Sequence, residues 1–176
     1  MIPRPKSGTD YLEYFDTYVS LVTDPDVLQG LTKQGANMAA LIRHNGESKG
    51  GYAYADGKWS IKRLLLHLTD GERMFCYRAL CIARGDQQAL PGFDQDAYAA
   101  NDGSEARTLM GILDEYLSVR KATVSLFQNF TSDALARRGV ANGSNITASA
   151  LPWIMLGHDI HHYRMMIDRY GMSACD

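Results

Sequence analysis

Apolar residues recur at helical spacing along almost the whole chain, and this pattern limits the fold more than any other feature of the sequence. It begins in a tyrosine-rich run at residues 11–22 and continues over residues 27–42, 60–84 and 104–130, with a last run that ends at Tyr170. Residues three and four apart share one face of an α-helix, so each run predicts an amphipathic helix. No pair of strands is predicted, because alternating β-branched runs are few. The sequence therefore predicts an all-α fold, a four-helix bundle with a short extra N-terminal helix.

Capping residues and helix breakers indicate where these helices begin and end. Ser60 is predicted to cap the helix of residues 60–84, and Gly85 is predicted to stop it. Pro25 suits the first turn of the second helix. The connection at residues 84–104 is long enough for a topology other than simple up-and-down. Leu90, Pro91 and Phe93 predict that residues 90–98 form an ordered loop against the bundle.

The start of the last helix is open between two residues. A helix that begins at Thr147 would contain Pro152 in its interior, where the missing backbone N–H predicts a kink. A helix that begins at Ser149 would carry the same proline harmlessly in its first turn.

Size and composition limit the class of protein. The 176 residues are predicted to form one domain, residues 1–176, and their 45% hydrophobic content is enough for a core without disulfides. A net charge of −2 with scattered basic residues disfavours nucleic acid as a partner, and no apolar run could cross a membrane. The N-terminus lacks the apolar region of a signal peptide, which indicates a cytoplasmic protein. Cys76, Cys81 and Cys175 are expected to be reduced thiols.

Three of the five histidines lie within the segment GHDIHHY at residues 157–163. His158 and His162 are four residues apart, so one helix face presents both imidazoles to a single ion. His67, at the edge of the apolar face of its helix, is the best candidate for a third ligand from a facing helix. His161 lies off the direction that the pair shares, although a role as ligand or outer-shell group stays open, and His44 is expected to be solvated. The sequence thus predicts a three-histidine site with an open fourth position.

Three segments carry a resemblance to a known family: WSIKRLLLHLTDGERMFCYRALCIARGD, LPGFDQDAY and GHDIHHYRMMIDRYG. Their residues and order resemble the DinB-like (DinB/YfiT) superfamily of metal-dependent proteins. The resemblance implies a bundle with up-down-down-up topology and a divalent metal, zinc or nickel, held by three histidines. Matched residue by residue, the family's ligands fall on His67, His158 and His162. Characterised members of this family include S-transferases that use bacillithiol or mycothiol.

These observations predict a metal-dependent enzyme that acts on a small molecule. Three neutral imidazoles leave the charge of the ion uncompensated, so both a hydrolase and an S-transferase for a low-molecular-weight thiol of the bacillithiol, mycothiol or glutathione type are consistent with the site. The alternative is a non-catalytic metal-binding or stress-response protein, in the form of a homodimer that buries an aromatic helix face.

The sequence assigns no catalytic residue. Asp70 could orient an imidazole or act as a base, or be a solvated carboxylate, and Gly71 could make room for a substrate or for close helix packing. Helical spacing predicts that the remaining polar residues of this segment do not come together over the metal, so none is assigned a role; these are Glu72, Tyr77, Arg78 and Arg84.

Overall fold

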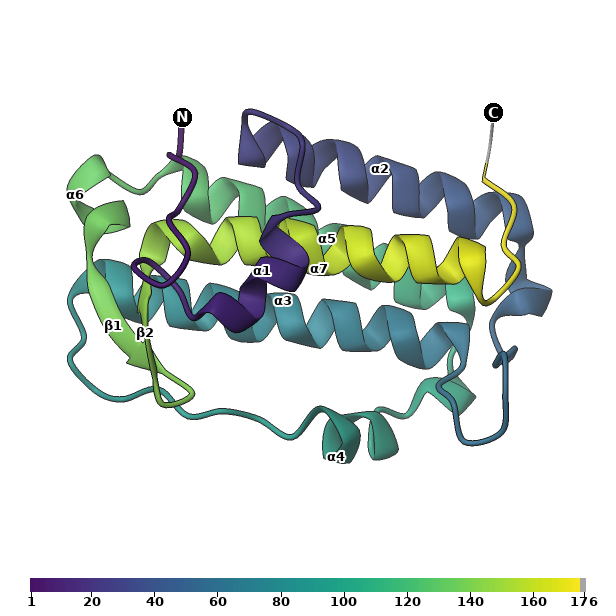
Figure 1. Cartoon of the computed structure of the whole chain (residues 1–176). Coiled ribbons are helices and arrows are strands. Elements are labelled where there is room, and N and C mark those ends of the chain that lie inside the picture. Colours follow the sequence, from purple (N-terminus) through teal and green to yellow (C-terminus); the bar gives the residue numbers. More distant parts are fainter. Residues whose placement is uncertain (175–176) are drawn as a thin grey trace.

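Four long helices form the body of the molecule (Figure 1). The computed structural model describes residues 1–174, so Cys175 lies outside the described residues. The long helices are α2 (Val27–Asn45), α3 (Ile61–Arg84), α5 (Leu109–Gln128) and α7 (Leu151–Asp168). The predicted four-helix bundle is confirmed. Among residues 1–174, none of the helices combines the length and the apolar character that a membrane span requires.

The order of the helices in space differs from their order along the chain. Helices α2 and α3 each pack against both α5 and α7, which places α2 and α3 at opposite corners of the bundle. The colours of Figure 1 show that α2 and α7 run in one direction and that α3 and α5 run in the other. This is the expected up-down-down-up topology. Because α3 and α5 are parallel, the chain between them must return along the whole bundle, and residues 85–108, which include α4 (Gln95–Ala100), make this return.

Local sequence explains the helix ends, with one correction. Ser60 accepts a hydrogen bond from the backbone N–H of Arg63 at 3.3 Å, which confirms it as the cap of α3, and Gly85 ends the helix with a φ of 84°. At the start of α2 the cap is Asp26, whose carboxylate accepts bonds from two backbone N–H groups. Pro25 therefore lies before the cap, and the prediction that it occupies the first turn is wrong. Its fixed φ restricts the residue before the cap without occupying a helical position.

A β-hairpin contradicts the prediction that the chain has no strand pair. Strands β1 (Arg138–Ala141) and β2 (Ser144–Thr147) pair antiparallel, and Asn142 and Gly143 form the turn with φ values of 49° and 73°. A two-residue turn of this kind needs positive φ at both positions, and Asn-Gly is the dipeptide that adopts it most readily. The strands of four residues each are too short for a visible alternating pattern, and the Asn-Gly pair was the signal that could have revealed them.

The last helix begins later than either predicted start. A short 3-10 turn covers Ala148–Ala150, and α7 begins at Leu151. Pro152 consequently lies in the first turn of α7, where it costs no hydrogen bond. The predicted helix 104–130 is likewise shorter, because Thr108 caps α5 and residues 104–106 form a separate 3-10 turn.

The short N-terminal helix is confirmed, and it packs across the middle of α7 (Figure 1). It consists of a 3-10 turn, Glu13–Phe15, followed by α1 (Asp16–Val19), and so is shorter than the helical pattern of residues 11–22. The contact depends on Gly157, because a Cβ there would lie 2.2 Å from the backbone oxygen of Tyr18. This close approach holds the N-terminal aromatic residues beside the histidines of α7.

A buried polar network joins the four long helices inside the core. The guanidinium of Arg120 on α5 donates to Glu72 on α3 at 2.7 Å, to Asp159 on α7 at 2.6 Å and to the backbone oxygen of Leu31 on α2 at 2.8 Å. All three charged residues are almost completely buried, with Arg120 and Glu72 4% and Asp159 1% exposed. Tyr116 also donates to Asp159. Removal of one member would leave buried charges without partners.

We expect Arg120→Met to lower the free energy of unfolding by about 3–5 kcal/mol, since Glu72 and Asp159 would remain buried without their cation. Urea denaturation followed by circular dichroism measures the change. Arg73→Met is the matched control, because Arg73 pairs with Asp70 and Glu115 while its own side chain is half-exposed, and the expected loss is below about 1 kcal/mol. Equal losses in the two variants would contradict the role of the buried network.

A second prediction concerns Gly157. Helix propensity alone would make Gly157→Ala stabilising by about 1 kcal/mol, but the clash with the backbone of Tyr18 should reverse the sign and cost about 1–3 kcal/mol. Gly71→Ala, also inside a long helix, is the control: the nearest atom to its Cβ would be 3.9 Å away, so we expect it to be neutral or stabilising. If both substitutions stabilise the protein, α1 is not held by this contact.

Candidate metal centre

Three histidines from two helices bring their ring nitrogens together. His67 lies in the second turn of α3, and His158 and His162 lie on the face of α7 that packs against α3. The Nε2 atom of His158 is 3.1 Å from the Nε2 atoms of both His67 and His162, and the ligand atoms of all three lie within 4.8 Å of one another. These are the three residues that the sequence analysis selected.

The donor set fits a divalent metal ion. Zinc–nitrogen bonds of about 2.0–2.1 Å in tetrahedral geometry place ligand nitrogens roughly 3.3 Å apart. The two separations that involve His158, each 3.1 Å, are close to this distance. Hydrogen bonding explains the cluster less well, because one imidazole nitrogen carries either one hydrogen or one lone pair and cannot fully satisfy two neighbours. The nitrogen of His158 has two such neighbours at equal distance. That these residues bind a metal remains a prediction.

Burial keeps the three imidazoles neutral, which is the form that binds metal. Burial lowers the pKa of His67 to about 4. The pKa of His162 falls to about 3, first through burial and then through the neighbouring His67 and His161. His158 is shifted in the same direction, mainly by burial and then by the nearby histidines. At neutral pH each ring therefore has one unprotonated nitrogen, whose lone pair can bind a metal.

Aromatic rings surround the cluster. The indole of Trp59 lies 5.0 Å from the ring of His67, and the phenol ring of Tyr18 lies 5.1 Å from that of His158. His161 packs edge-on against Tyr18 and His162, but its nitrogens are not part of the cluster found among residues 1–174. Its position is that of a flanking ring and not of a ligand. His44 is exposed near the end of α2, as expected.

The polar neighbours of His67 along α3 do not orient its imidazole. Asp70 pairs with Arg73 at 3.3 Å, and Glu72 pairs with Arg120 in the core. The Nδ1 atom of His162 is buried without a hydrogen-bond partner among the described residues.

Sequence reasoning missed Asp159, which follows His158 directly but points into the core network. Only its place beside a predicted ligand could have drawn attention to it.

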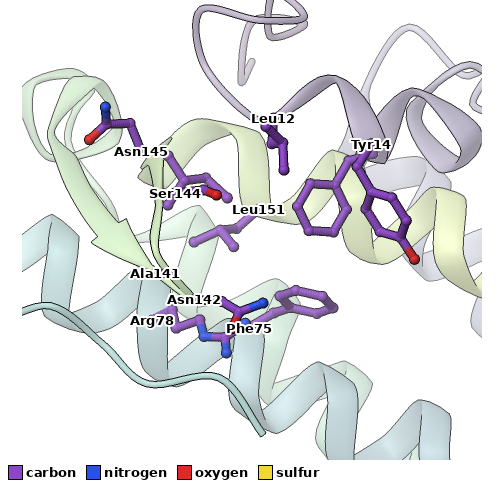
Figure 2. A pocket seen from close by; sticks show the side chains of 11 residues that line it. Leu12, Tyr14, Phe75, Arg78, Ala141, Asn142, Ser144, Asn145 and Leu151 are labelled. Carbon is purple, nitrogen blue, oxygen red and sulfur yellow. The ribbon is translucent and has the colours of Figure 1, made fainter.

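A cleft of about 180 Å³ opens beside His67 and His158. Gly71 lines it, which supports the interpretation that the missing side chain leaves room for a substrate. Its other walls come from the N-terminal segment, α3, the crossover and the hairpin, and are mainly aromatic: Tyr14, Phe15, Tyr18, Phe75, Arg78, Phe93, Gln95 and Asn142. A second cavity of about 130 Å³, drawn in Figure 2, shares five of these residues and so continues the cleft away from the histidines.

Residues 90–98 pack against the bundle as predicted, although not entirely as a loop. Leu90 is 5% exposed and exchanges two backbone hydrogen bonds of 2.9 Å with the hairpin. Arg78 donates to the backbone oxygen of Pro91 at 2.8 Å. Residues from Gln95 onward belong to helix α4. The sequence assigns no role to Arg78, but this residue follows His67 by eleven positions, slightly more than three helical turns, and it lines the same cleft.

Comparison with known proteins agrees with this architecture. A sequence profile of the DinB superfamily matches residues 30–166. The fold is similar to that of YfiT from Bacillus subtilis, described as a probable metal-dependent hydrolase with an unusual four-helix bundle topology, with a TM-score of 0.73 and 18% identity over 96% of this chain and 94% of that one.

A second similar structure is a mycothiol-dependent maleylpyruvate isomerase, with a TM-score of 0.62 and 14% identity. The match covers 92% of this chain but only 61% of the isomerase. Among curated proteins, none matches the chain by sequence. Since the profile match spans most of the sequence, and the bundle has the YfiT fold, the chain belongs to the DinB superfamily.

Proposed function

We propose that this protein is a divalent-metal-dependent enzyme that acts on a small molecule. The observation that carries the proposal is the convergence of three neutral imidazoles, those of His67, His158 and His162, at the wall of an open, mainly aromatic cleft. We assign zinc or nickel to these residues. A divalent ion with three neutral ligands and an open position would lower the pKa of a thiol or of a water molecule bound beside it.

The residues around the cluster would keep bulk water away from the reacting atoms. The rings of Trp59 and Tyr18 cover His67 and His158. Burial raises the pKa of Tyr18 to about 12, so its hydroxyl stays protonated at neutral pH and can donate a hydrogen bond. A cleft of this kind holds a small molecule with an apolar body and leaves little room for a macromolecule.

Two reactions are consistent with this arrangement: transfer of a low-molecular-weight thiol to an electrophile, and hydrolysis. The similarity to a mycothiol-dependent isomerase and to a probable metal-dependent hydrolase supports each of them. We place the thiol reaction first. Its thiol would be of the bacillithiol, mycothiol or glutathione type, and we propose the cytoplasm as its location, where such thiols are kept reduced. The cleft beside the histidines favours an enzyme over the non-catalytic alternative. A homodimer stays a prediction.

Assays of the protein loaded with zinc or nickel test this proposal. One assay follows conjugation of each thiol to chlorodinitrobenzene, and another follows hydrolysis of nitrophenyl esters. Turnover that requires the metal and is lost in His162→Ala would support the enzyme. A protein that binds the metal tightly but catalyses neither reaction would support the non-catalytic alternative.

We expect His162→Ala to weaken metal binding by at least ~100-fold, more than the 10–100-fold loss typical of outer-shell changes, because two imidazoles remain. The bundle should stay folded, since its core does not depend on the ion. Isothermal titration with zinc and circular dichroism measure the two effects. Addition of zinc should raise the melting temperature of the wild type and leave that of the variant unchanged.

His161→Ala is the matched control, because it removes the neighbouring imidazole outside the cluster and should keep full metal binding. Loss of binding in this control alone would show that the wrong histidine was selected. An unfolded His162→Ala chain would instead show that the metal is needed for the fold, which would remove the main support for an enzyme.

A further inference from the structure

Arg78 is a buried cation at the far end of the cleft from the metal centre. Its side chain is only 7% exposed, and it lines both the cleft beside the histidines and the cavity of Figure 2. It lies eleven residues after His67 on α3, which corresponds to about 16 Å along the helix axis on nearly the same face.

This guanidinium has few partners within the protein. Among residues 1–174, its hydrogen-bond partner is the backbone oxygen of Pro91, its Nε has none, and no carboxylate forms an ion pair with it. It also lies 5.8 Å from the centre of the Phe75 ring. A buried cation is costly unless it is paired, and an arginine has five N–H donors to satisfy. Arg120, which is 4% exposed, is by contrast bonded to two carboxylates and shows what a paired arginine looks like in this protein.

Asn142 supplies a second polar group to the same place. The Asn-Gly turn of the hairpin puts its side chain into both cavities, and Figure 2 shows it between Arg78 and Phe75. Its position is fixed by Gly92, where a Cβ would lie 2.2 Å from the Asn142 Oδ1 atom. A guanidinium beside a side-chain amide presents several hydrogen-bond donors to one point.

The surroundings of this pair favour a negatively charged ligand. The residues that line the two cavities include no aspartate and no glutamate. Between Arg78 and the histidines the walls are apolar rings, chiefly those of Phe15 and Phe75. A ligand that fits both ends therefore has an anionic group at one end, an apolar body, and a group that approaches the metal centre at the other end.

We propose that Arg78, assisted by Asn142, binds the carboxylate of the substrate, and that the substrate is an amphipathic acid whose apolar body lies on the aromatic walls. This inference rests on the proposed function for the position of the reacting end. Side chains on a helix lean toward its N-terminus and arginine is longer than histidine, so the gap between guanidinium and imidazole is on the order of 10 Å. The substrate is accordingly of medium length.

The first experiment measures the carboxylate subsite without any metal. Octanoate and octanol are titrated into the metal-free protein by calorimetry, and we expect octanoate to bind at least tenfold more tightly. Arg78→Met should abolish this preference, and Arg78→Lys, which keeps the charge, should retain part of it. Arg84→Met is the control for charge, because Arg84 is an exposed residue on the same helix, and it should bind as the wild type does. Circular dichroism checks that each variant is folded.

The second experiment tests whether one ligand binds at both ends of the cleft. Mercaptohexanoic, mercaptooctanoic and mercaptoundecanoic acids, each with its matched alcohol, are added to cobalt-loaded protein, and the thiolate-to-cobalt absorption band reports binding. We expect the acid to bind more tightly than its alcohol at the chain length that spans the cleft, and only when Arg78 is present.

The outcomes separate this inference from the proposed function. A thiolate band with equal affinity for acid and alcohol would overturn the role of Arg78 and leave the metal site standing. Arg78-dependent binding of octanoate without a thiolate band would support the carboxylate subsite and count against a thiol reaction. A preference for octanoate that persists in folded Arg78→Met would also overturn the inference.

Discussion

The buried guanidinium of Arg120 is the interaction on which the arrangement of the four helices depends. It bonds to groups on α2, α3 and α7 from its own place on α5, so each long helix contributes to one network. Asp159 of this network is the residue directly after His158, and neighbouring residues on a helix point about 100° apart. A rotation of α7 that turned His158 away from α3 would also withdraw Asp159 from Arg120. The ion pairs of the core and the geometry of the three-histidine cluster are therefore set by the same rotation of α7.

Much of the fold was predictable because long helices repeat one pattern many times. The apolar periodicity located all four helices of the bundle, and the predicted cap of α3, Ser60, is the cap in the structure. The errors fall where few residues carry the signal. The hairpin strands are only four residues long, and the N-terminal helix was predicted to be longer than it is because Tyr11 is buried outside the helix, where it continues the apolar pattern. Periodicity reports which residues are buried, and a short irregular segment can bury them equally well.

The three histidines were predictable from spacing within one helix, together with one apolar-edge histidine on another. The carboxylate subsite that we propose was not predictable, because the argument for Arg78 depends on the partners that its side chain lacks. Arginines at positions 73, 78 and 120 look alike in the sequence, yet only the packing of separate segments shows that the first and the last have carboxylate partners and that Arg78 has none among the described residues. The same is true of Asp159 and Glu72, whose partner is contributed by α5. Pairing between helices is a tertiary property that a single sequence does not display.

The cleft is formed partly by helices of the bundle and partly by the segments that connect them. The histidines come from α3 and α7, which the core holds rigidly, whereas most walls come from outside the bundle: Tyr14 and Tyr18 from the N-terminal segment, Phe93 from the crossover and Asn142 from the hairpin turn. The crossover is present because α3 and α5 are parallel, so the topology itself brings Phe93 over α3. Under the proposed function, rigidly held histidines with walls built from connecting segments would allow substrate preference to vary while the reaction stays the same. If the proposed function holds, residues of these segments would determine which acid binds, and the three histidines would determine the reaction.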